Sequence, residues 1–193
     1  MTNIALFHSA LGVRDGVRDA AKRLTSAGHT VTIVDQYDGT TFSEYSQGAA
    51  HYKAIGYPTL MQRALDGVTT LPDGFITIGF SNGGGMAEYV ATQRRVSRVI
   101  LLSGTLPLEM LGADGWPSDV PVQTHYMSND PFRQQEWVDS LVSAVTACGA
   151  RIEVYDYPGT GHLFTDPSLQ DEYDPLATEL LWSRVLSFCG SSD

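Results

Sequence analysis

Six short apolar segments alternate with amphipathic segments along the chain, and this alternation limits the folds that are open to it. The apolar segments are rich in Val, Ile, Thr and Tyr, and several lack a polar face, as strands covered on both sides do. Strands that alternate with helices form a parallel sheet with right-handed crossovers and helices on both faces. The predicted strands span residues 3–8, 30–35, 75–80, 97–103, 122–128 and 151–157, and the predicted helices span residues 13–27, 44–66, 82–94, 132–148 and 174–189.

The composition fits one domain over residues 1–193, because 42% of the residues are apolar and 18% are charged. The formal net charge of -10 argues against nucleic acid as a partner, since phosphate binding depends on Lys and Arg. The N-terminal residues lack the pattern of a signal peptide, and no apolar run approaches the ~18 residues of a membrane helix. We therefore expect a cytoplasmic protein that contacts neither nucleic acid nor membrane, as a monomer or a homodimer.

Motifs for zinc or nucleotide binding do not occur, so neither a metal nor a cofactor is expected. Cys148 and Cys189 lie in predicted helices. Free thiols are typical of a reducing cytoplasm, although the sequence leaves a disulfide open. The segment between Pro107 and Pro121 contains two glycines and Trp116 and is predicted to be a long surface loop.

Three consecutive glycines open a predicted helix in the stretch GFSNGGGMA, residues 79–87, although glycine disfavours helices. Gly79 to Gly83 fits the pattern G-x-S-x-G, in which a serine occupies a tight strand-to-helix turn above the sheet. A side chain at these glycines would collide with the neighbouring strand or the helix, so the glycines indicate close packing. The start of the helix also provides free N–H groups near a developing oxyanion. We therefore interpret Ser81 as a nucleophile.

His162 is the predicted base for Ser81. It follows the last predicted strand in YPGTGHLF, where Gly159 and Gly161 allow the chain to turn back over the sheet. A histidine in this place can accept the serine proton and later donate it to the leaving group. The other histidines lie within predicted elements, at the opposite edge of the sheet or ahead of the serine in the chain; they are His8, His29, His51 and His125.

Asp130 is the predicted acid that orients His162. It follows the fifth predicted strand in SNDPF, and the order Ser81, Asp130, His162 is that of the α/β-hydrolases. Two alternatives stay open. Asp130 also suits the N-cap of the following helix, and some α/β-hydrolases place the acid after the preceding strand, here within residues 103–109.

With these residues in place, the chain resembles the dienelactone hydrolase family of α/β-hydrolases over nearly its whole length. The stretches that carry the resemblance are FHSALGV (7–13), GFSNGGGMA (79–87), SNDPF (128–132) and YPGTGHLF (157–164). The resemblance implies a three-layer α/β-hydrolase fold with a mostly parallel sheet of about six strands, in the order 2-1-3-4-5-6. It also implies a minimal version of the fold, without the leading strands of larger α/β-hydrolases.

The same resemblance places an oxyanion hole at two backbone N–H groups. One belongs to Asn82, directly after the nucleophile, and the other to Ala10, or alternatively Leu11, in the loop after the first strand. A competing interpretation treats this loop as an ordinary strand-to-helix turn. Side chains near the strand ends are the candidate substrate contacts, with core or lid packing as the alternative role for the aromatic ones; they are Ser9, Leu11, Tyr37, Trp116, Phe132 and Phe164.

The chain departs from the best-known members of the family, which use a cysteine nucleophile. Those members carry a glutamate in the oxyanion loop, where this chain has Ser9, and an arginine shortly after the histidine, where it has Asp166. A serine needs a histidine base rather than a nearby carboxylate, so the first departure is consistent with the serine. The charge of Asp166 would repel a carboxylate, which argues against dienelactone as the substrate.

The sequence thus predicts a serine hydrolase that cleaves a small neutral or cationic ester or lactone through an acyl-enzyme. Ser81, His162 and Asp130 are the predicted catalytic residues. An acyltransferase or amidase would use the same residues, and only products formed with competing nucleophiles would distinguish them. A catalytically silent binding module on the same fold is the third interpretation, because a fold alone does not establish activity.

Overall fold

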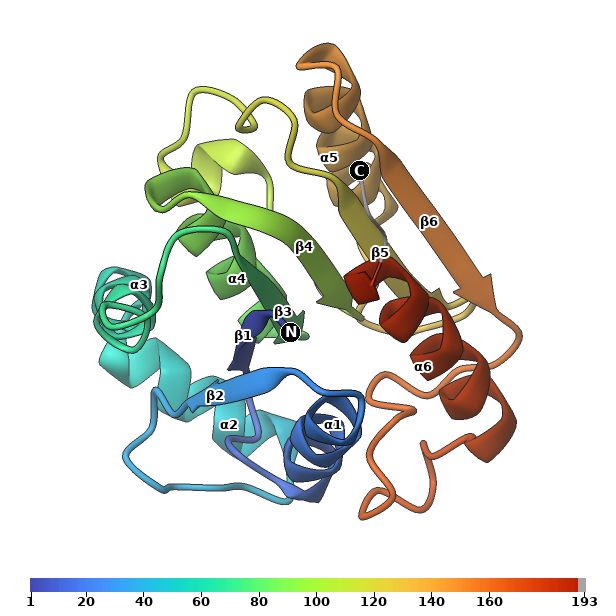
Figure 1. The fold of residues 1–193 in the computed structure, drawn as a ribbon. Coiled ribbons are helices and arrows are strands. Elements are labelled where there is room, and N and C mark those ends of the chain that lie inside the picture. Colours follow the sequence, from blue (N-terminus) through green and yellow to red (C-terminus); the bar gives the residue numbers. More distant parts are fainter. Residues whose placement is uncertain (191–193) are drawn as a thin grey trace.

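The computed structural model describes residues 1–190, and its centre is a six-stranded sheet in the order β2-β1-β3-β4-β5-β6 (Figure 1). Every neighbouring pair of strands is parallel. The predicted strand order and direction are therefore confirmed, and each strand begins and ends within one residue of its predicted bounds. The strands are β1 (Asn3–Phe7), β2 (Thr30–Val34), β3 (Phe75–Phe80), β4 (Val96–Leu102), β5 (Val122–Met127) and β6 (Ile152–Tyr157).

Helices cover both faces of the sheet, as Figure 1 shows. Helices α1 and α6 pack against one face, and α3, α4 and α5 pack against the other. Strand β1 supplies both layers because its side chains alternate, with Ile4 and Leu6 on the first face and Ala5 and Phe7 on the second. The helices are α1 (Asp15–Ser26), α2 (Tyr45–Ile55), α3 (Tyr57–Asp66), α4 (Asn82–Gln93), α5 (Gln135–Ala147) and α6 (Pro175–Gly190), with a short 3-10 helix, η1 (Leu108–Leu111).

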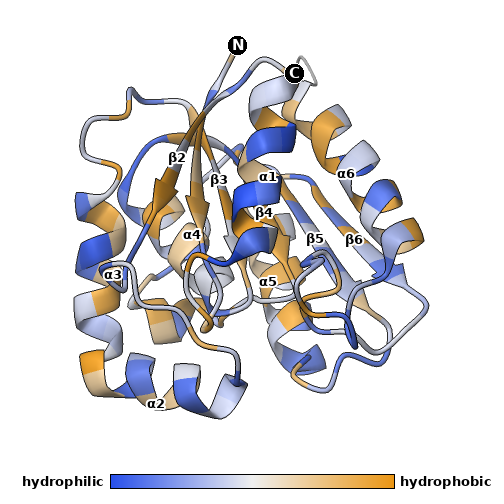
Figure 2. Ribbon diagram, turned by 90° about the horizontal axis from the view of Figure 1, so that it is seen from below, coloured by the Kyte–Doolittle hydropathy of each residue, from blue (hydrophilic) through white to orange (hydrophobic). Residues whose placement is uncertain are grey.

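The hydropathy pattern agrees with these three layers. In Figure 2 the central strands are mainly hydrophobic, whereas the flanking helices carry both hydrophobic and hydrophilic residues. Within residues 1–190, none of the helices combines the length and the apolar character that a membrane crossing requires. Cys148 and Cys189, whose pairing the sequence left open, are both free thiols.

The single helix predicted over residues 44–66 is wrong, because α2 and α3 are separate helices that meet at Gly56. Gly56 has φ 84° and ψ 142°, outside the helical region, and Pro58 follows in the first turn of α3. A proline lacks the N–H that a continuing helix would donate, and its ring clashes with the carbonyl four residues earlier, so a break here is expected. Helix α2 lies against the loop after β1, where a Cβ at Gly48 would come within 2.3 Å of the Ala10 carbonyl oxygen.

The predicted surface loop over residues 107–121 is partly ordered and partly buried. It contains η1, and Trp116 packs in the core on the face of α3, α4 and α5. The Trp116 indole N–H donates a hydrogen bond to the Val120 carbonyl oxygen over 2.8 Å, which satisfies the polar atom of this buried side chain.

The turn from β3 into α4 is closely packed at its glycines. A Cβ at Gly79 would lie 2.0 Å from the Gly83 carbonyl oxygen, and one at Gly83 would lie 2.4 Å from the His8 carbonyl oxygen. At Gly84 a Cβ would lie 2.2 Å from the Gly104 carbonyl oxygen. All three distances are far below van der Waals contact, so side chains here would push α4 away from the strand ends. The glycines therefore provide clearance, as the sequence indicates.

Replacing Gly84 by Ala should lower the free energy of unfolding by about 1–2 kcal/mol, because the clash outweighs the better helix propensity of alanine. Urea unfolding followed by circular dichroism measures this loss. Gly115→Ala is the matched control, since Gly115 has open space around it and no positive φ. Equal stability of the two variants would contradict the clearance role of Gly84.

Candidate active site

Ser81 lies at the carboxyl end of β3, in a turn with a strained backbone conformation. Its φ is 53° and its ψ is -121°, and α4 begins at the next residue. Such a conformation costs a non-glycine residue about 1–3 kcal/mol, which the surrounding structure must offset. Hydrogen bonds fix it on both sides: the Ser81 N–H donates to the Leu102 carbonyl oxygen, and the Gly84 N–H donates to the Ser81 carbonyl oxygen, each over 2.8 Å.

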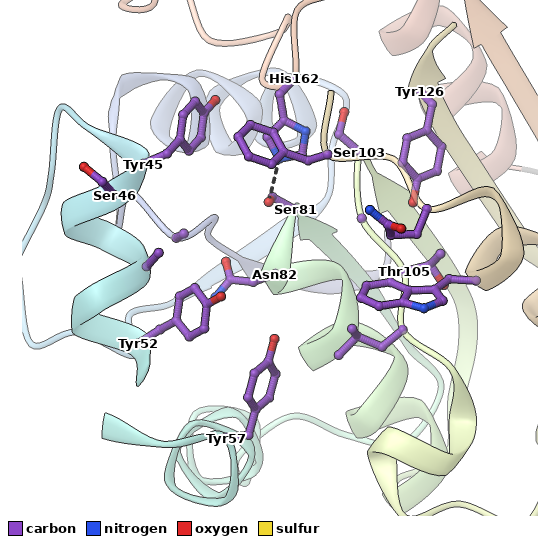
Figure 3. Close-up of a pocket in the computed structure, with 17 residues that line it drawn as sticks. Tyr45, Ser46, Tyr52, Tyr57, Ser81, Asn82, Ser103, Thr105, Tyr126 and His162 are labelled. Atoms are coloured by element: carbon purple, nitrogen blue, oxygen red, sulfur yellow. Dashed lines mark hydrogen bonds between the residues drawn. The ribbon is translucent and has the colours of Figure 1, made fainter. Parts of the chain in front are cut away.

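His162 brings its imidazole to Ser81 from the loop after β6. The Ser81 Oγ lies 2.7 Å from His162 Nε2, and the imidazole is almost completely buried (Figure 3). Glu172 stabilises this loop, since its carboxylate accepts the Leu163 N–H over 2.7 Å. The close approach requires a glycine next to the histidine, because a Cβ at Gly161 would lie 2.3 Å from the Glu172 carbonyl oxygen.

Asp130 lies on the other side of the imidazole. His162 Nδ1 donates to the carboxylate, with distances of 2.7 Å to Oδ2 and 2.9 Å to Oδ1. With Nδ1 protonated, Nε2 is free to accept the Ser81 proton. Asp130 does not cap α5, which begins only at Gln135; its Oδ1 instead accepts the Phe132 N–H in a local turn. In the alternative segment, residues 103–109, the carboxylate of Glu109 is exposed, and Asp130 is the acid that contacts His162.

The buried histidines outside this cluster have structural partners. His8 donates from Nδ1 to the Ser9 carbonyl oxygen and accepts the Gln36 N–H at Nε2, and burial lowers its pKa. His125 lies between Gln123 and Tyr157 at 2.8 Å from each, and burial lowers its pKa to about 3. Both are therefore neutral side chains of the core, and neither lines the cavity next to Ser81.

Backbone N–H groups near Ser81 are available for an oxyanion. Within residues 1–190, the N–H groups of Ala10 and Asn82 make no hydrogen bond to another protein group. The Leu11 N–H, by contrast, donates to Ser9 Oγ over 3.2 Å. Ala10 and Asn82 line the cavity and Leu11 does not, so the geometry favours Ala10 over Leu11 as the second donor.

A cavity of about 360 Å³ opens beside Ser81 and His162 (Figure 3). This volume suits a small molecule. None of its lining residues is a Lys, Arg, Asp or Glu, and aromatic rings and small polar groups form most of the wall. Across the described part of the chain, no three His, Cys, Asp or Glu side chains gather in a way that could hold a metal ion. The lining residues are Ala10, Tyr45, Ser46, Ala49, Tyr52, Tyr57, Ser81, Asn82, Ser103, Gly104, Thr105, Leu106, Tyr126, Phe132, Gln134, Trp137 and His162.

Of the predicted substrate contacts, Phe132 lines the cavity and stacks edge-on against His162, with 4.7 Å between ring centroids. The other five predicted contacts do not line the cavity. Four of them are large side chains that pack in the core: Leu11 and Phe164 on the face of α1 and α6, and Tyr37 and Trp116 on the opposite face. Ser9 is buried, and its hydroxyl oxygen accepts a hydrogen bond from the Leu11 N–H.

Asp166 also lies outside the cavity, so the expectation that its charge repels a substrate carboxylate is wrong. Its carboxylate lies 3.5 Å from Arg14 Nε and accepts hydrogen bonds from the Ser168 N–H and hydroxyl. Helix α1 packs closely on it, since a Cβ at Gly16 would come within 2.8 Å of Asp166 atoms. Asp166 therefore pairs with Arg14 and does not repel ligands at Ser81.

The tyrosines of α2 and α3, which form one side of the cavity, are not among the residues predicted from the sequence. Tyr45 packs edge-on against His162 and donates its hydroxyl to the Glu172 carboxylate, 2.9 Å from each oxygen. Tyr52 and Tyr57 flank the helix break at Gly56 and line the cavity. The sequence Gly56-Tyr57-Pro58 was the signal that could have found them, because a chain that bends there can bring side chains from both sides of the bend to the cavity.

Glu88 supports the opposite wall of the cavity from within α4. This fully buried carboxyl accepts the Thr105 hydroxyl at 2.5 Å and the Leu106 N–H at 2.8 Å. Burial raises the pKa of Glu88 to about 8, although the two hydrogen bonds oppose the shift. The carboxyl is therefore mostly protonated at neutral pH, and it holds the segment that follows β4 against α4.

Glu88 should make the protein less stable as the pH rises. Between its ordinary pKa of 4.5 and its raised pKa of about 8, the folded chain keeps a proton that the unfolded chain has released. The free energy of unfolding should therefore fall through this window by up to about 1.4 kcal/mol per pH unit. Glu88→Gln should remove this slope, as urea unfolding at several pH values would measure.

The exposed Glu109→Gln is the control and should keep the slope of the unmodified protein. A Glu88→Gln variant with the same pH dependence as the unmodified protein would contradict a raised pKa at Glu88.

The fold is shared with solved α/β-hydrolase structures. A dienelactone hydrolase-like promiscuous phosphotriesterase from metagenomic libraries has a TM-score of 0.81 and 23% identity, over 97% of this chain and 85% of that one. A putative dienelactone hydrolase from Klebsiella pneumoniae has a TM-score of 0.75 and 17% identity, over 99% and 88% of the two chains. The mouse alpha/beta hydrolase domain-containing protein 10 has a TM-score of 0.69 and 13% identity, over 97% and 89%.

These similarities establish a three-layer α/β-hydrolase fold, and identities this low carry nothing further about activity. No protein with a curated description matches the sequence. The sequence model of the dienelactone hydrolase family, in contrast, matches residues 2–192. The chain therefore belongs to the dienelactone hydrolase family.

Proposed function

We propose that this member of the family is a serine hydrolase that cleaves a small neutral carboxylic ester or lactone. The observation that carries the proposal is the continuous chain of contacts from Ser81 through His162 to Asp130, with 2.7 Å between the closest atoms at each step. A hydrolase activity fits the family and the fold. The ester substrate, the serine mechanism and the role of each residue are the parts that we propose.

In the proposed reaction, Ser81 Oγ attacks the ester carbonyl while His162 Nε2 takes its proton. The carbonyl oxygen becomes an oxyanion, which accepts hydrogen bonds from the N–H groups of Ala10 and Asn82. The bond to the alcohol then breaks, and the alcohol leaves with the proton from His162. A water molecule attacks the acyl-serine with His162 again as the base, and this step releases the acid and restores Ser81.

Two features of the first turn of α4 support the oxyanion step. The Asn82 N–H is one of the groups at a helix N-terminus that have no partner within the helix, and the helix dipole is positive there. Backbone donors are also fixed before the charge develops, so no reorganisation is needed during the reaction. The glycines that let α4 approach the strands therefore also fix the position of this donor.

The cavity supports a neutral substrate. Its lining contains no charged side chain, so neither a carboxylate nor an ammonium group would find a counter-ion beside Ser81. The net charge of -10 further disfavours the long-range attraction of anions. Dienelactone carries a carboxylate and does not fit this lining, so we propose an uncharged ester or lactone instead.

Replacing Ser81 by Ala should abolish turnover of neutral aryl esters such as p-nitrophenyl acetate, because Ser81 is the cavity hydroxyl that contacts the proposed base, His162 Nε2. Steady-state hydrolysis of purified, folded protein measures the loss. Ser143→Ala, on the exposed surface of α5, is the control and should leave turnover as it is. Residual turnover at the rate of the unmodified protein would place the nucleophile elsewhere.

Asp130→Asn should lower kcat by about 10²–10⁴-fold, because an amide no longer holds the protonated Nδ1 or stabilises the imidazolium. The matched control is Glu109→Gln, which changes the carboxylate of the alternative segment and should leave kcat within about twofold. If the two effects were reversed, the acid would lie after β4.

A further inference from the structure

One end of the cavity carries hydroxyl and amide groups that the proposed mechanism does not use. Tyr52 in α2, Tyr57 in α3 and Asn82 in α4 line the cavity, and the ring centroids of the two tyrosines are 5.8 Å apart. Figure 3 shows both tyrosine side chains pointing toward the Asn82 side chain. Tyr37, from the loop after β2, is the buried neighbour of Asn82. We call these four residues the tyrosine subsite.

Two hydroxyl groups of the tyrosine subsite have no protein partner. Within residues 1–190, neither the Tyr52 hydroxyl nor the Tyr57 hydroxyl makes a hydrogen bond, and both side chains line the cavity. The Tyr37 hydroxyl and the Asn82 Oδ1 are instead buried, and the Asn82 side chain lies within hydrogen-bonding reach of the Tyr37 hydroxyl. The groups open to a ligand are therefore the hydroxyls of Tyr52 and Tyr57, each of which can donate or accept a hydrogen bond.

The tyrosine subsite is uncharged. Burial raises the pKa of Tyr37 to about 12, with a smaller contribution from Tyr52 and Tyr57, although hydrogen bonding to the Asn82 side chain opposes the shift. Burial also raises the pKa of Tyr57. These hydroxyls therefore stay protonated at neutral pH, and each can donate or accept a hydrogen bond. With no charged residue in the cavity lining, this end is suited to a neutral group that both donates and accepts, as an alcohol or phenol hydroxyl does.

We propose that the tyrosine subsite binds a neutral hydroxyl group on one arm of the ester while the ester carbonyl lies at Ser81. The hydroxyl donates to one of the two hydroxyls of Tyr52 and Tyr57 and accepts from the other. The inference rests on the proposed function and narrows its substrate class to small, neutral, hydroxylated esters.

Matched ester pairs test the proposal on each arm. The alcohol-arm pair is 3-hydroxyphenyl acetate and phenyl acetate, and the acyl-arm pair is methyl 3-hydroxybutyrate and methyl butyrate. In one of the pairs, kcat/KM should be at least about tenfold higher for the hydroxylated member, as expected for one or two hydrogen bonds in a buried site. Acetylcholine and monomethyl succinate, which carry a positive and a negative charge, should be poorer substrates. Equal rates within both pairs, or a preference for acetylcholine, would overturn the proposal.

Two variants locate the preference within the cavity. Tyr52→Phe and Tyr57→Phe each remove one hydroxyl of the subsite, and at least one should reduce the hydroxylated-to-plain ratio of kcat/KM by about three- to tenfold. Tyr126→Phe is the matched control, because Tyr126 lines the same cavity from β5, outside the tyrosine subsite. The control should keep the ratio, and an equal loss in Tyr126→Phe would overturn the assignment.

Binding to Ser81→Ala separates this inference from the proposed function. Calorimetric titration of this variant should show tighter binding of the hydroxylated ester of the preferred pair, whether or not the unmodified protein hydrolyses either ester. Selective binding without hydrolysis would support the subsite and reject the hydrolase. Hydrolysis without selective binding or selective turnover would support the hydrolase and reject the subsite.

Discussion

The site depends on the close contact between the first turn of α4 and the strand ends around it. A Cβ at Gly83 would lie 2.4 Å from the His8 carbonyl oxygen, and one at Gly84 would lie 2.2 Å from the Gly104 carbonyl oxygen. Because these side chains are absent, α4 begins directly after Ser81 and holds that residue at φ 53°. The strain at Ser81 is thus maintained by backbone packing, and the same packing fixes the position of Asn82, which lines the cavity.

The loops that follow the other strands complete the site around this fixed turn. Asp130 and His162 come from the loops after β5 and β6, and a shared carboxylate–imidazole contact of 2.7 Å joins them. The cavity walls have two different origins. On one side, the aromatic side chains of α2 and α3 surround Asn82. On the other side, the segment after β4 is held by the buried Glu88. The walls are uncharged, and hydrogen-bonding groups inside them provide the selectivity that we propose.

The sequence was most informative where backbone constraints leave a local signature. The apolar segments predicted a parallel sheet, the family resemblance implied its strand order, and the glycines around Ser81 and His162 mark the turns, so the fold and the position of these two residues could be predicted. The lining of the cavity could not be predicted in the same way. Tyr37, Trp116 and Phe164 follow strands or lie in loops, but packing buries them in the core, and that depends on neighbours distant in sequence. Tyr52 and Tyr57 reach the cavity only because the chain breaks at Gly56.

The most direct test of the account is the reactivity of Ser81 toward a fluorophosphonate, measured by intact-mass spectrometry and peptide mapping of the folded protein. If His162 and Asp130 activate this serine, the protein should gain one adduct per chain, and the modified peptide should contain Ser81. Such a probe reacts with an activated serine whatever the natural substrate is, so the result does not depend on the ester that we propose. An unmodified protein, or an adduct on a residue other than Ser81, would contradict the central claim.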